Sequence, residues 1–308
     1  MNRMFRRKSG SIRPPAVAGR FYPADPAELR RMIEYFLKEA VVAWASRPCA
    51  STLSKTLETH GRDARATIPK AVIVPHAGYI YSGPIAASAY AQLAPPVFRS
   101  PDSVGTEGEA RDIVKRVVLL GPSHYVLFDG LAASSAKAFA TPLGTVPVDT
   151  AAIAEICSRL PQVSVRDDAH AEEHALEVQL PFLQIVLADF KIIPLLVGEA
   201  SDSEIEAVIE ALWGGDETRI VVSSDLSHFH DYATAQQTDS ETAHLIESLD
   251  AKRLRGDLAC GCRPICGLLS AAKERGMRCR AVDLRNSGDT SGDRDRVVGY
   301  GAFVVTQN

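Results

Sequence analysis

Three histidines each follow a short apolar run with the pattern of a buried β-strand. The runs and their histidines are Ala71–Pro75 with His76, Arg116–Leu120 with His124, and Arg219–Val222 with His228. Ligands of open α/β sheets bind outside the carboxyl ends of the strands, so the three imidazoles are expected to meet at one sheet edge. One such histidine alone is more often a hydrogen-bonded turn residue, but three in the same setting favour a shared site. Nearby Gly78, Gly83 and Gly121 leave room either for a ligand or only for tight turns.

A cluster of cysteines follows later in the chain. Cys260 comes just before a predicted helix at Arg263–Arg275, and a helix N-terminus favours the thiolate, so the pKa of Cys260 is expected to be lowered. The thiolate is the form that binds metal. The spacing to Cys262 and Cys266 is neither that of a structural zinc site nor that of an iron–sulfur cluster. We therefore expect one working thiolate, Cys260, with the other two as buried neighbours.

Glu173 and His174 open another predicted helix, Glu173–Leu187, on which Glu173 and Glu177 share a face. The spacing is not the H-E-x-x-H pattern of zinc proteases. Two interpretations stay open. The segment is either an ordinary amphipathic helix, or its carboxylate–histidine pair lines a pocket or supports a metal ligand through a hydrogen bond.

The elements that carry these residues alternate along the chain. Further strands are predicted at Lys191–Val197, Arg280–Leu284 and Val297–Thr306. The first helix is predicted to begin at Pro26, with Asp25 as its N-cap. Further helices are predicted over Ile85–Leu93, Thr150–Leu160, Asp202–Trp213 and Ala233–Leu249. This alternation predicts an α/β fold, with a mostly parallel central sheet covered by helices on both faces. We expect a single domain over residues 1–308, with a flexible N-terminus at 1–12 and surface insertions at 45–69 and 99–112.

Composition excludes several classes of function. The net charge of the 308 residues is −4, which does not steer the chain toward nucleic acid or an anionic membrane. The basic residues Arg3, Arg6, Arg7 and Lys8 are followed by Ser9-Gly10-Ser11-Ile12-Arg13 and not by an apolar run, so no signal peptide is expected. No apolar run is long enough for a transmembrane helix. The expectation is therefore a cytoplasmic protein whose six cysteines are reduced, with neither nucleic acid nor membrane as a partner.

Several groups of residues occur in an order that covers the chain from residue 13 onward. They are Arg13–Pro23, Pro75–Tyr79 with Ser82-Gly83, Gly121–His124, Glu173-His174 with Gln179–Pro181, Ser223–His228, and Cys260-Gly261 with Pro264-Ile265. In this order they resemble the Memo-like family, which in bacteria and archaea is called AmmeMemoRadiSam system protein B.

The resemblance implies a fold similar to class III extradiol dioxygenases (LigB-like), which hold non-haem iron with two histidines and a carboxylate. In Memo-like proteins two histidines and a cysteine take that place, and they correspond to His76, His124 and Cys260. Asp225 and His228 match neighbouring pocket residues. The implied cofactor is iron or copper, with zinc also compatible with these ligands, and the family name implies association with radical SAM system proteins.

Three functions are consistent with these residues. The first is a metal-dependent oxidoreductase, in which His228 or Asp225 transfers a proton or orients the ligand. The second is a non-catalytic module that binds a small molecule or peptide carrying a phosphate or another anion. Tyr79, Tyr81 and Arg263 would then read the ligand. The third is a metal-free nucleophile, the Cys260 thiol activated by His228. Ser123, Glu173 and His174 are expected to line the same pocket.

Overall fold

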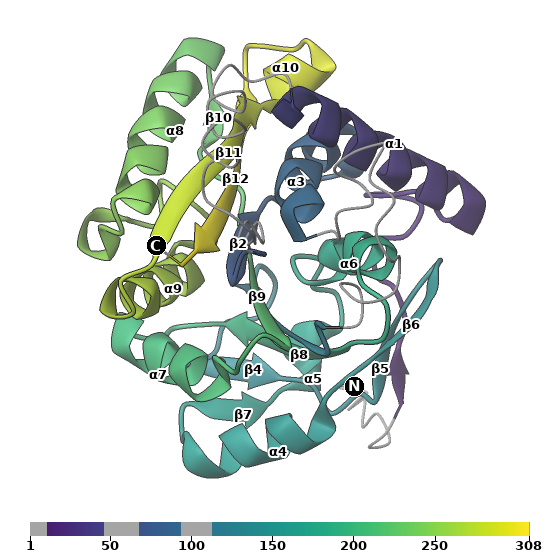
Figure 1. Ribbon diagram of the computed structural model, residues 1–308, viewed down its shortest axis with the longest axis vertical. Helices are drawn as coiled ribbons and strands as arrows, with labels where there is room; N and C mark the ends of the chain where they lie inside the picture. Colours follow the sequence, from purple (N-terminus) through teal and green to yellow (C-terminus); the bar gives the residue numbers. More distant parts are fainter. Residues whose placement is uncertain (1–10, 46–67, 94–112, 308) are drawn as a thin grey trace, which may run out of the picture.

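A mixed sheet of nine strands lies at the centre of the computed structural model, which describes residues 11–45, 68–93 and 113–307 (Figure 1). Four neighbouring strands at its centre run parallel. In spatial order they are β2 (Ala71–Val74), β9 (Thr218–Ser223), β3 (Arg116–Pro122) and β8 (Lys191–Val197). Nearly every residue of the four is buried, which explains their continuous apolar runs. Their carboxyl ends therefore meet at one edge, as predicted.

The strands outside this core make the sheet only partly parallel. On one side β12 (Val297–Thr306) pairs antiparallel with β2, and both β11 (Arg278–Asn286) and β10 (His228–His230) pair antiparallel with β12. On the other side β4 (Leu131–Ala133) is antiparallel to β8 and parallel to β7 (Val163–Val165). A small second sheet joins β1 (Ile12–Arg13), β5 (Ala138–Thr141) and β6 (Gly144–Pro147).

One predicted strand has a different role in the sheet. The run Arg280–Leu284 was expected to be a buried parallel strand, but it belongs to the antiparallel strand β11, in which only Cys279, Val282 and Asn286 are buried. The connection from β11 to β12 consists of the short helix α10 (Ser287–Ser291) and residues 292–296, and a connection of this length suits antiparallel neighbours.

Helices form a layer on each side of the sheet (Figure 1). One layer contains α1 (Pro26–Ala45), α3 (Tyr79–Leu93) and α6 (Leu180–Val186), and the other contains α7 (Asp202–Leu212), α8 (Tyr232–Glu247) and α9 (Cys262–Glu274). The helix α4 (Thr150–Arg159) packs beside β7 and β8, and the short α5 (Asp167–His170) beside β4. The predicted α/β class, with helices on both faces of a central sheet, is thus confirmed.

The helix starts follow local side-chain chemistry. Asp25 caps α1 by accepting the Glu28 N–H at 2.8 Å, as predicted. The helix α3 begins six residues ahead of the predicted Ile85, and Gly83 lies inside it rather than in a turn. A Cβ at Gly83 would lie 2.6 Å from Cε2 of Phe36 on α1. This glycine therefore allows two helices to pack closely.

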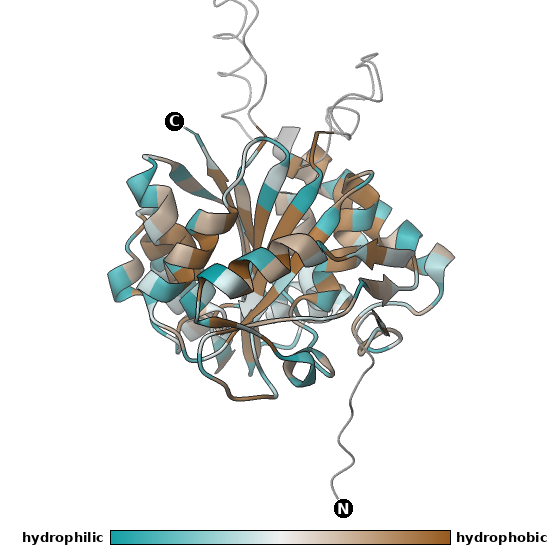
Figure 2. Cartoon of the chain, turned by 90° about the horizontal axis from the view of Figure 1, so that it is seen from below, coloured by the Kyte–Doolittle hydropathy of each residue, from teal (hydrophilic) through white to brown (hydrophobic). Residues whose placement is uncertain are grey.

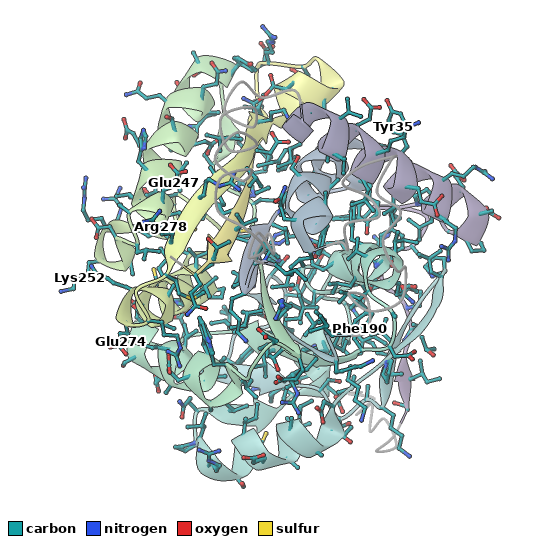
Figure 3. The ribbon with its side chains drawn as sticks, in the orientation of Figure 1. Tyr35, Phe190, Glu247, Lys252, Glu274 and Arg278 are labelled. Atoms are coloured by element: carbon teal, nitrogen blue, oxygen red, sulfur yellow. The ribbon has the colours of Figure 1, made fainter. Side chains whose placement is uncertain are left out.

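The buried apolar residues of the described ranges form one continuous core. Figure 2 shows apolar strands through the centre of the molecule and polar residues on the outer turns of the helices. Side chains such as Tyr35 on α1 point outward at the periphery (Figure 3). Within the described ranges, no helix combines the length and apolar character needed to span a bilayer. The insertions predicted at 45–69 and 99–112, and the flexible N-terminus at 1–12, lie mainly outside the described residues.

Candidate metal centre

Three histidines converge beyond the carboxyl ends of the parallel strands. The candidate ligand atoms of His76, His124 and His174 all lie within 4.8 Å of one another. The ring centroids are 5.2 Å apart for His76 and His124, and 5.0 Å apart for His124 and His174. His76 follows β2 and His124 follows β3, whereas His174 lies in the segment between α5 and the 3₁₀-helix η2 (Glu177–Gln179).

The tautomer of His76 is fixed by a buried hydroxyl. Ser223 Oγ donates its single hydrogen to the Ala175 carbonyl at 2.6 Å and accepts a hydrogen bond from Gln179 Nε2 at 2.8 Å. His76 Nδ1 lies 2.9 Å from the same Oγ and must therefore donate to it. The proton of His76 then resides on Nδ1, and the lone pair on Nε2 faces the Sγ atom of Cys260 at 3.2 Å.

Cys260 thus touches the histidine cluster. Its sulfur also accepts the Asp225 N–H at 3.2 Å. Burial, together with the nearby Asp225 charge, raises the pKa of the Cys260 thiol to about 12. The predicted lowering is therefore wrong. The thiol does stand just ahead of α9, but desolvation outweighs the favourable helix dipole there. Contact with His76 Nε2, together with a raised pKa, argues against a metal-free nucleophile activated by His228.

Glu173 supports two of the histidines. Its carboxylate accepts the His124 backbone N–H at 2.6 Å and lies 2.9 Å from His124 Nδ1. Burial acts to raise the pKa of Glu173, but the hydrogen bond with His124 outweighs burial and lowers this pKa to about 2. The pKa of His124 is raised: burial lowers it, but the hydrogen bond and charge of Glu173 outweigh that effect. An ionised carboxylate that binds Nδ1–H leaves Nε2 of His124 as the atom available to a metal.

The same carboxylate explains why the predicted helix does not begin at Glu173. Its Oε1 accepts the backbone N–H groups of His174 and Ala175, both at 2.9 Å. Such local side-chain bonds compete with helix formation. The helical segment begins only at Glu177, in the 3₁₀ form, and continues as α6.

His174 has a buried nitrogen that nothing satisfies. Its Nδ1 lies 3.4 Å from Glu173 Oε1 but makes no hydrogen bond within the described part of the chain. Burial, with the neighbouring His76, lowers the pKa of His174 to about 4, and burial also lowers that of His76 to about 3. Both rings are thus neutral at pH 7, which is the form that binds metal.

The spacing of the cluster fits a transition metal. Two nitrogens that each lie about 2.1 Å from one ion are at most about 4.2 Å apart. The candidate ligand atoms lie within 4.8 Å of one another, so ring shifts of about an ångström bring them to this coordination distance. An unsatisfied buried nitrogen on His174 is a second sign that the cluster accommodates a positive ion.

Asp225 and His228 lie around this cluster in different ways. Asp225 is buried, its Oδ1 accepts the His76 backbone N–H at 2.8 Å, and its Oδ2 lies 3.9 Å from His76 Nε2. Burial raises the pKa of Asp225 against the opposing hydrogen bond from His76 and the charge of His228. His228 is exposed on β10, where a bulge interrupts the pairing with β12, and it does not join the cluster.

A cleft of about 140 Å³ lies beside Cys260, the residue in contact with His76, but none of the three clustered histidines lines it. Its lining includes Ser123, Cys260 and Arg263, and Arg263 forms an exposed ion pair with Glu199. Of the predicted ligand-reading tyrosines, Tyr81 is 37% exposed. Tyr79 lies in the core instead, and its hydroxyl donates to the Val178 carbonyl at 2.5 Å, so it is not free for a ligand.

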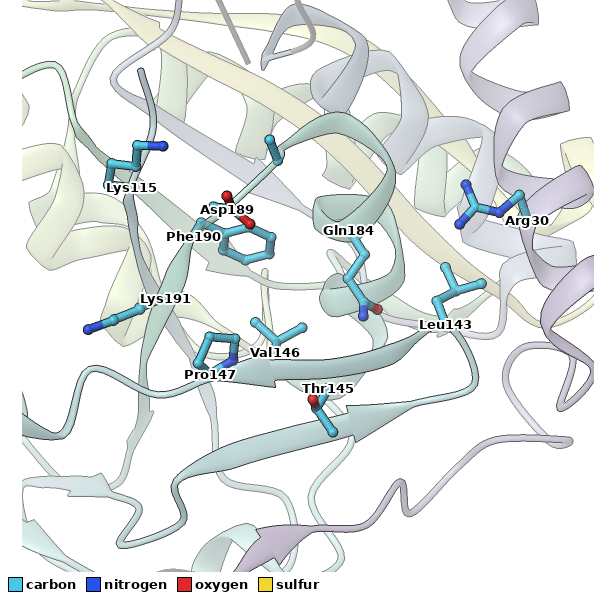
Figure 4. A pocket seen from close by; sticks show the side chains of 11 residues that line it. Arg30, Lys115, Leu143, Thr145, Val146, Pro147, Gln184, Asp189, Phe190 and Lys191 are labelled. Atoms are coloured by element: carbon cyan, nitrogen blue, oxygen red, sulfur yellow. The ribbon is translucent and has the colours of Figure 1, made fainter. Parts of the chain in front are cut away.

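A larger cavity of about 450 Å³ lies at the other end of β8 (Figure 4). Arg30, Gln184 and Phe190 are among the residues that line it, and none of its lining residues belongs to the histidine cluster.

Cys262 and Cys266 are buried as predicted, with their sulfur atoms 3.9 Å apart.

The family model described as Memo-like protein matches residues 13–304 of the chain. The chain belongs to the Memo-like family. A MEMO1 family protein of Sulfolobus acidocaldarius is 33% identical to it, over 94% of this chain and 97% of the relative. MEMO1 family proteins of Methanopyrus kandleri and Ignicoccus hospitalis are 34% and 35% identical, over 95% and 94% of this chain and 98% and 97% of theirs.

In this Memo-like protein, two of the three histidines expected to converge do so, His76 and His124. His174 occupies the third place in the cluster, while His228 stays at its rim. His174 was expected, beside Glu173 at the start of a predicted helix, only to line the pocket or to support a metal ligand through a hydrogen bond. The signal in the sequence was the adjacent Glu173, whose carboxylate joins His174 to His124.

Proposed function

We propose that this Memo-like protein binds a redox-active metal, iron or copper, in the histidine cluster and is a metal-dependent oxidoreductase. The observation that supports it best is the group of three imidazoles whose ligand atoms lie within 4.8 Å of one another. Imidazole and thiolate suit iron, copper and zinc, whereas magnesium and calcium prefer oxygen ligands. The position beyond the carboxyl ends of parallel strands also fits the dioxygenase-like arrangement implied by the resemblance.

Two ligand sets are compatible with the cluster, one completed by Cys260 and one by His174, and His76 and His124 belong to both. Each has its Nδ1 bonded to a fixed partner, Ser223 Oγ or Glu173 Oε1, which leaves Nε2 for the metal. The third ligand is Cys260 in the set implied by the family. His174 is the alternative within the cluster. A thiol that coordinates metal loses its proton, so binding through Cys260 would overcome its raised pKa and release a proton.

A bound iron or copper ion supplies Lewis-acid and one-electron chemistry to the pocket. The protein contributes the handling of protons. Asp225, whose pKa is raised, places Oδ2 beside His76 Nε2 and can hold a proton there. His228, exposed at the rim, can exchange protons with solvent.

Metal analysis of the untagged protein tests the proposal. The wild-type chain is expected to retain about one equivalent of metal, and the His76→Ala/His124→Ala/Cys260→Ala variant almost none. His244→Ala removes an exposed histidine of α8 and is the matched control that should retain metal. Equal metal content in the wild type and the triple variant would overturn the proposal.

Two single variants identify the third ligand. Cys260→Ser and His174→Ala each remove one candidate, and only the variant that removes a true ligand should lose affinity strongly. A sulfur ligand also gives a thiolate-to-metal charge-transfer band in the Cu(II) or Co(II) protein. This band should be absent from Cys260→Ser if sulfur coordinates the ion.

A second candidate function is the binding of a small anionic ligand in the cleft beside Cys260. The supporting observation is Arg263, which lines this cleft and whose ion pair with Glu199 is exposed and therefore weak. Anion binding that survives chelation and Cys260→Ser but is lost in Arg263→Met would favour this function. The radical SAM partner rests on the resemblance alone, and co-purification from cells that express both proteins tests it.

A further inference from the structure

A buried ion pair holds the N-terminal segment in place. Arg13 and Glu177 are 2% and 0% exposed, and Arg13 Nη1 lies 2.7 Å from Glu177 Oε2. The Glu177 carboxylate also accepts the backbone N–H groups of Ala16 at 2.6 Å and Val17 at 3.0 Å, and the Tyr22 hydroxyl at 2.6 Å. Residues 13–22 are thus folded around one carboxylate, which fixes where this segment lies.

The rest of the Arg13 guanidinium binds the loop that carries the supporting carboxylate. Nε donates to the His170 carbonyl at 2.7 Å, and Nη2 donates to the Glu173 carbonyl at 2.6 Å. The guanidinium also lies 5.0 Å from the centroid of the Phe139 ring. Arg13 therefore holds both ends of the turn that leads from α5 to Glu173.

The far end of the segment reaches the histidines directly. The ring of Phe21 lies 4.7 Å from the ring of His174, centroid to centroid. The Phe21 carbonyl accepts the Tyr79 N–H at 2.7 Å, in the turn that follows His76. One segment thus contacts the two loops that carry His174 and His76.

We propose that Arg13, Glu177 and Phe21 are positioning residues of the metal site, which they hold in its binding geometry through Glu173 and His174. This inference rests on the proposed metal binding. A buried ion pair contributes little net stability compared with apolar residues of the same volume, so its use here is better explained by orientation. Without these contacts the loop that carries Glu173 and His174 is less ordered. Metal binding must then order this loop, which lowers the affinity for the ion.

Titration with Co(II), followed by visible absorption, provides the test. Arg13→Met keeps the apolar stem but removes the guanidinium, and it should weaken Co(II) binding about tenfold, near the lower end of the effect of outer hydrogen bonds at metal sites. Arg219→Met is the matched control. Arg219 is also buried, at 4% exposure, but among the described residues its guanidinium bonds only to the carbonyls of Asp216, just before β9, and Thr218, at its start. Its variant should bind Co(II) within about twofold of wild type.

Phe21→Leu keeps the proposal testable if Arg13→Met does not fold. It should shift the Co(II) absorption bands and weaken binding severalfold, while Phe190→Leu, in the distant cavity of Figure 4, should change neither. Wild-type affinity and an unchanged spectrum in folded Phe21→Leu and Arg13→Met would overturn the positioning role. Failure of the wild-type protein itself to bind Co(II) would instead overturn the proposed function.

Discussion

The hydroxyl of Ser223 holds His76 in one tautomer, so the Ser223→Ala variant should lose both stability and metal affinity. Ser223 Oγ takes part in three hydrogen bonds, to the Ala175 carbonyl, Gln179 Nε2 and His76 Nδ1. All four residues are buried. Water therefore cannot easily replace the lost partner.

The size of both effects follows from these contacts. Each hydrogen bond contributes about 1 kcal/mol net, and groups left unsatisfied cost somewhat more, so the free energy of unfolding should fall by about 2–4 kcal/mol. Without Ser223 the proton of His76 is free to move to Nε2, where it blocks the lone pair. Loss of such an outer hydrogen bond typically weakens metal binding about 10- to 100-fold.

Urea denaturation measures the stability, Co(II) titration measures the affinity, and long-range ¹H–¹⁵N spectra report the His76 tautomer. Thr242→Val is the control, because it removes a buried hydroxyl of α8 whose only hydrogen bond within the described part of the chain is to the Thr238 carbonyl. It should destabilise the protein without changing metal affinity. A wild-type His76 protonated on Nε2, or a Ser223→Ala variant with unchanged affinity, would refute the reasoning.

Three further predictions follow from other contacts. Glu173→Gln, which removes the charge beside His124 Nδ1, should weaken Co(II) binding about tenfold in the same titration, and an unchanged affinity would contradict the assigned role. Burial lowers the pKa of His170 to about 4, so the unfolded chain binds its proton more readily, and His170 alone should contribute a fall in the free energy of unfolding of about 1.4 kcal/mol per pH unit from pH 6.5 to 4. In urea denaturation at each pH, His170→Gln should remove that share of the slope, and an equal slope in both proteins would count against it. Gly83→Ala should lower the free energy of unfolding despite the better helix propensity of alanine, because overpacking against Phe36 costs about 1–3 kcal/mol. A variant as stable as wild type would mean that Phe36 moves aside freely.

The main outline of the site could be predicted because strand ends are visible in the sequence. The runs before His76 and His124 are continuously apolar, and only strands buried on both faces need that composition. Once the strands are parallel, their carboxyl ends share one edge, and the side chains that follow them converge. After β9 the same reasoning pointed to His228, which stays outside the cluster. Asp225, which only the resemblance assigned to the pocket, follows the same strand and lies 3.9 Å from His76 Nε2.

Other features depend on contacts that the sequence does not display. His174 reaches the cluster because Glu173 binds the backbone of both His124 and His174, a pairing across 49 residues for the first of these. The pKa of Cys260 depends on burial, which overrides the local effect of the helix behind it. For Arg280–Leu284, apolar composition alone did not distinguish a central parallel strand from an outer antiparallel one.

The wide separation of the site residues along the chain has a consequence for folding. Cys260 and His76 touch across 184 residues, and His76 and Ser223 across 147. Pairing of β2, β9 and β3 must therefore precede any high-affinity site, and such non-local pairing makes folding slow. An ion that binds only the fully assembled site stabilises the native state by mass action and binds partly folded chains weakly. Metal uptake by a refolding sample would then report the last steps of assembly, later than the recovery of helical circular dichroism.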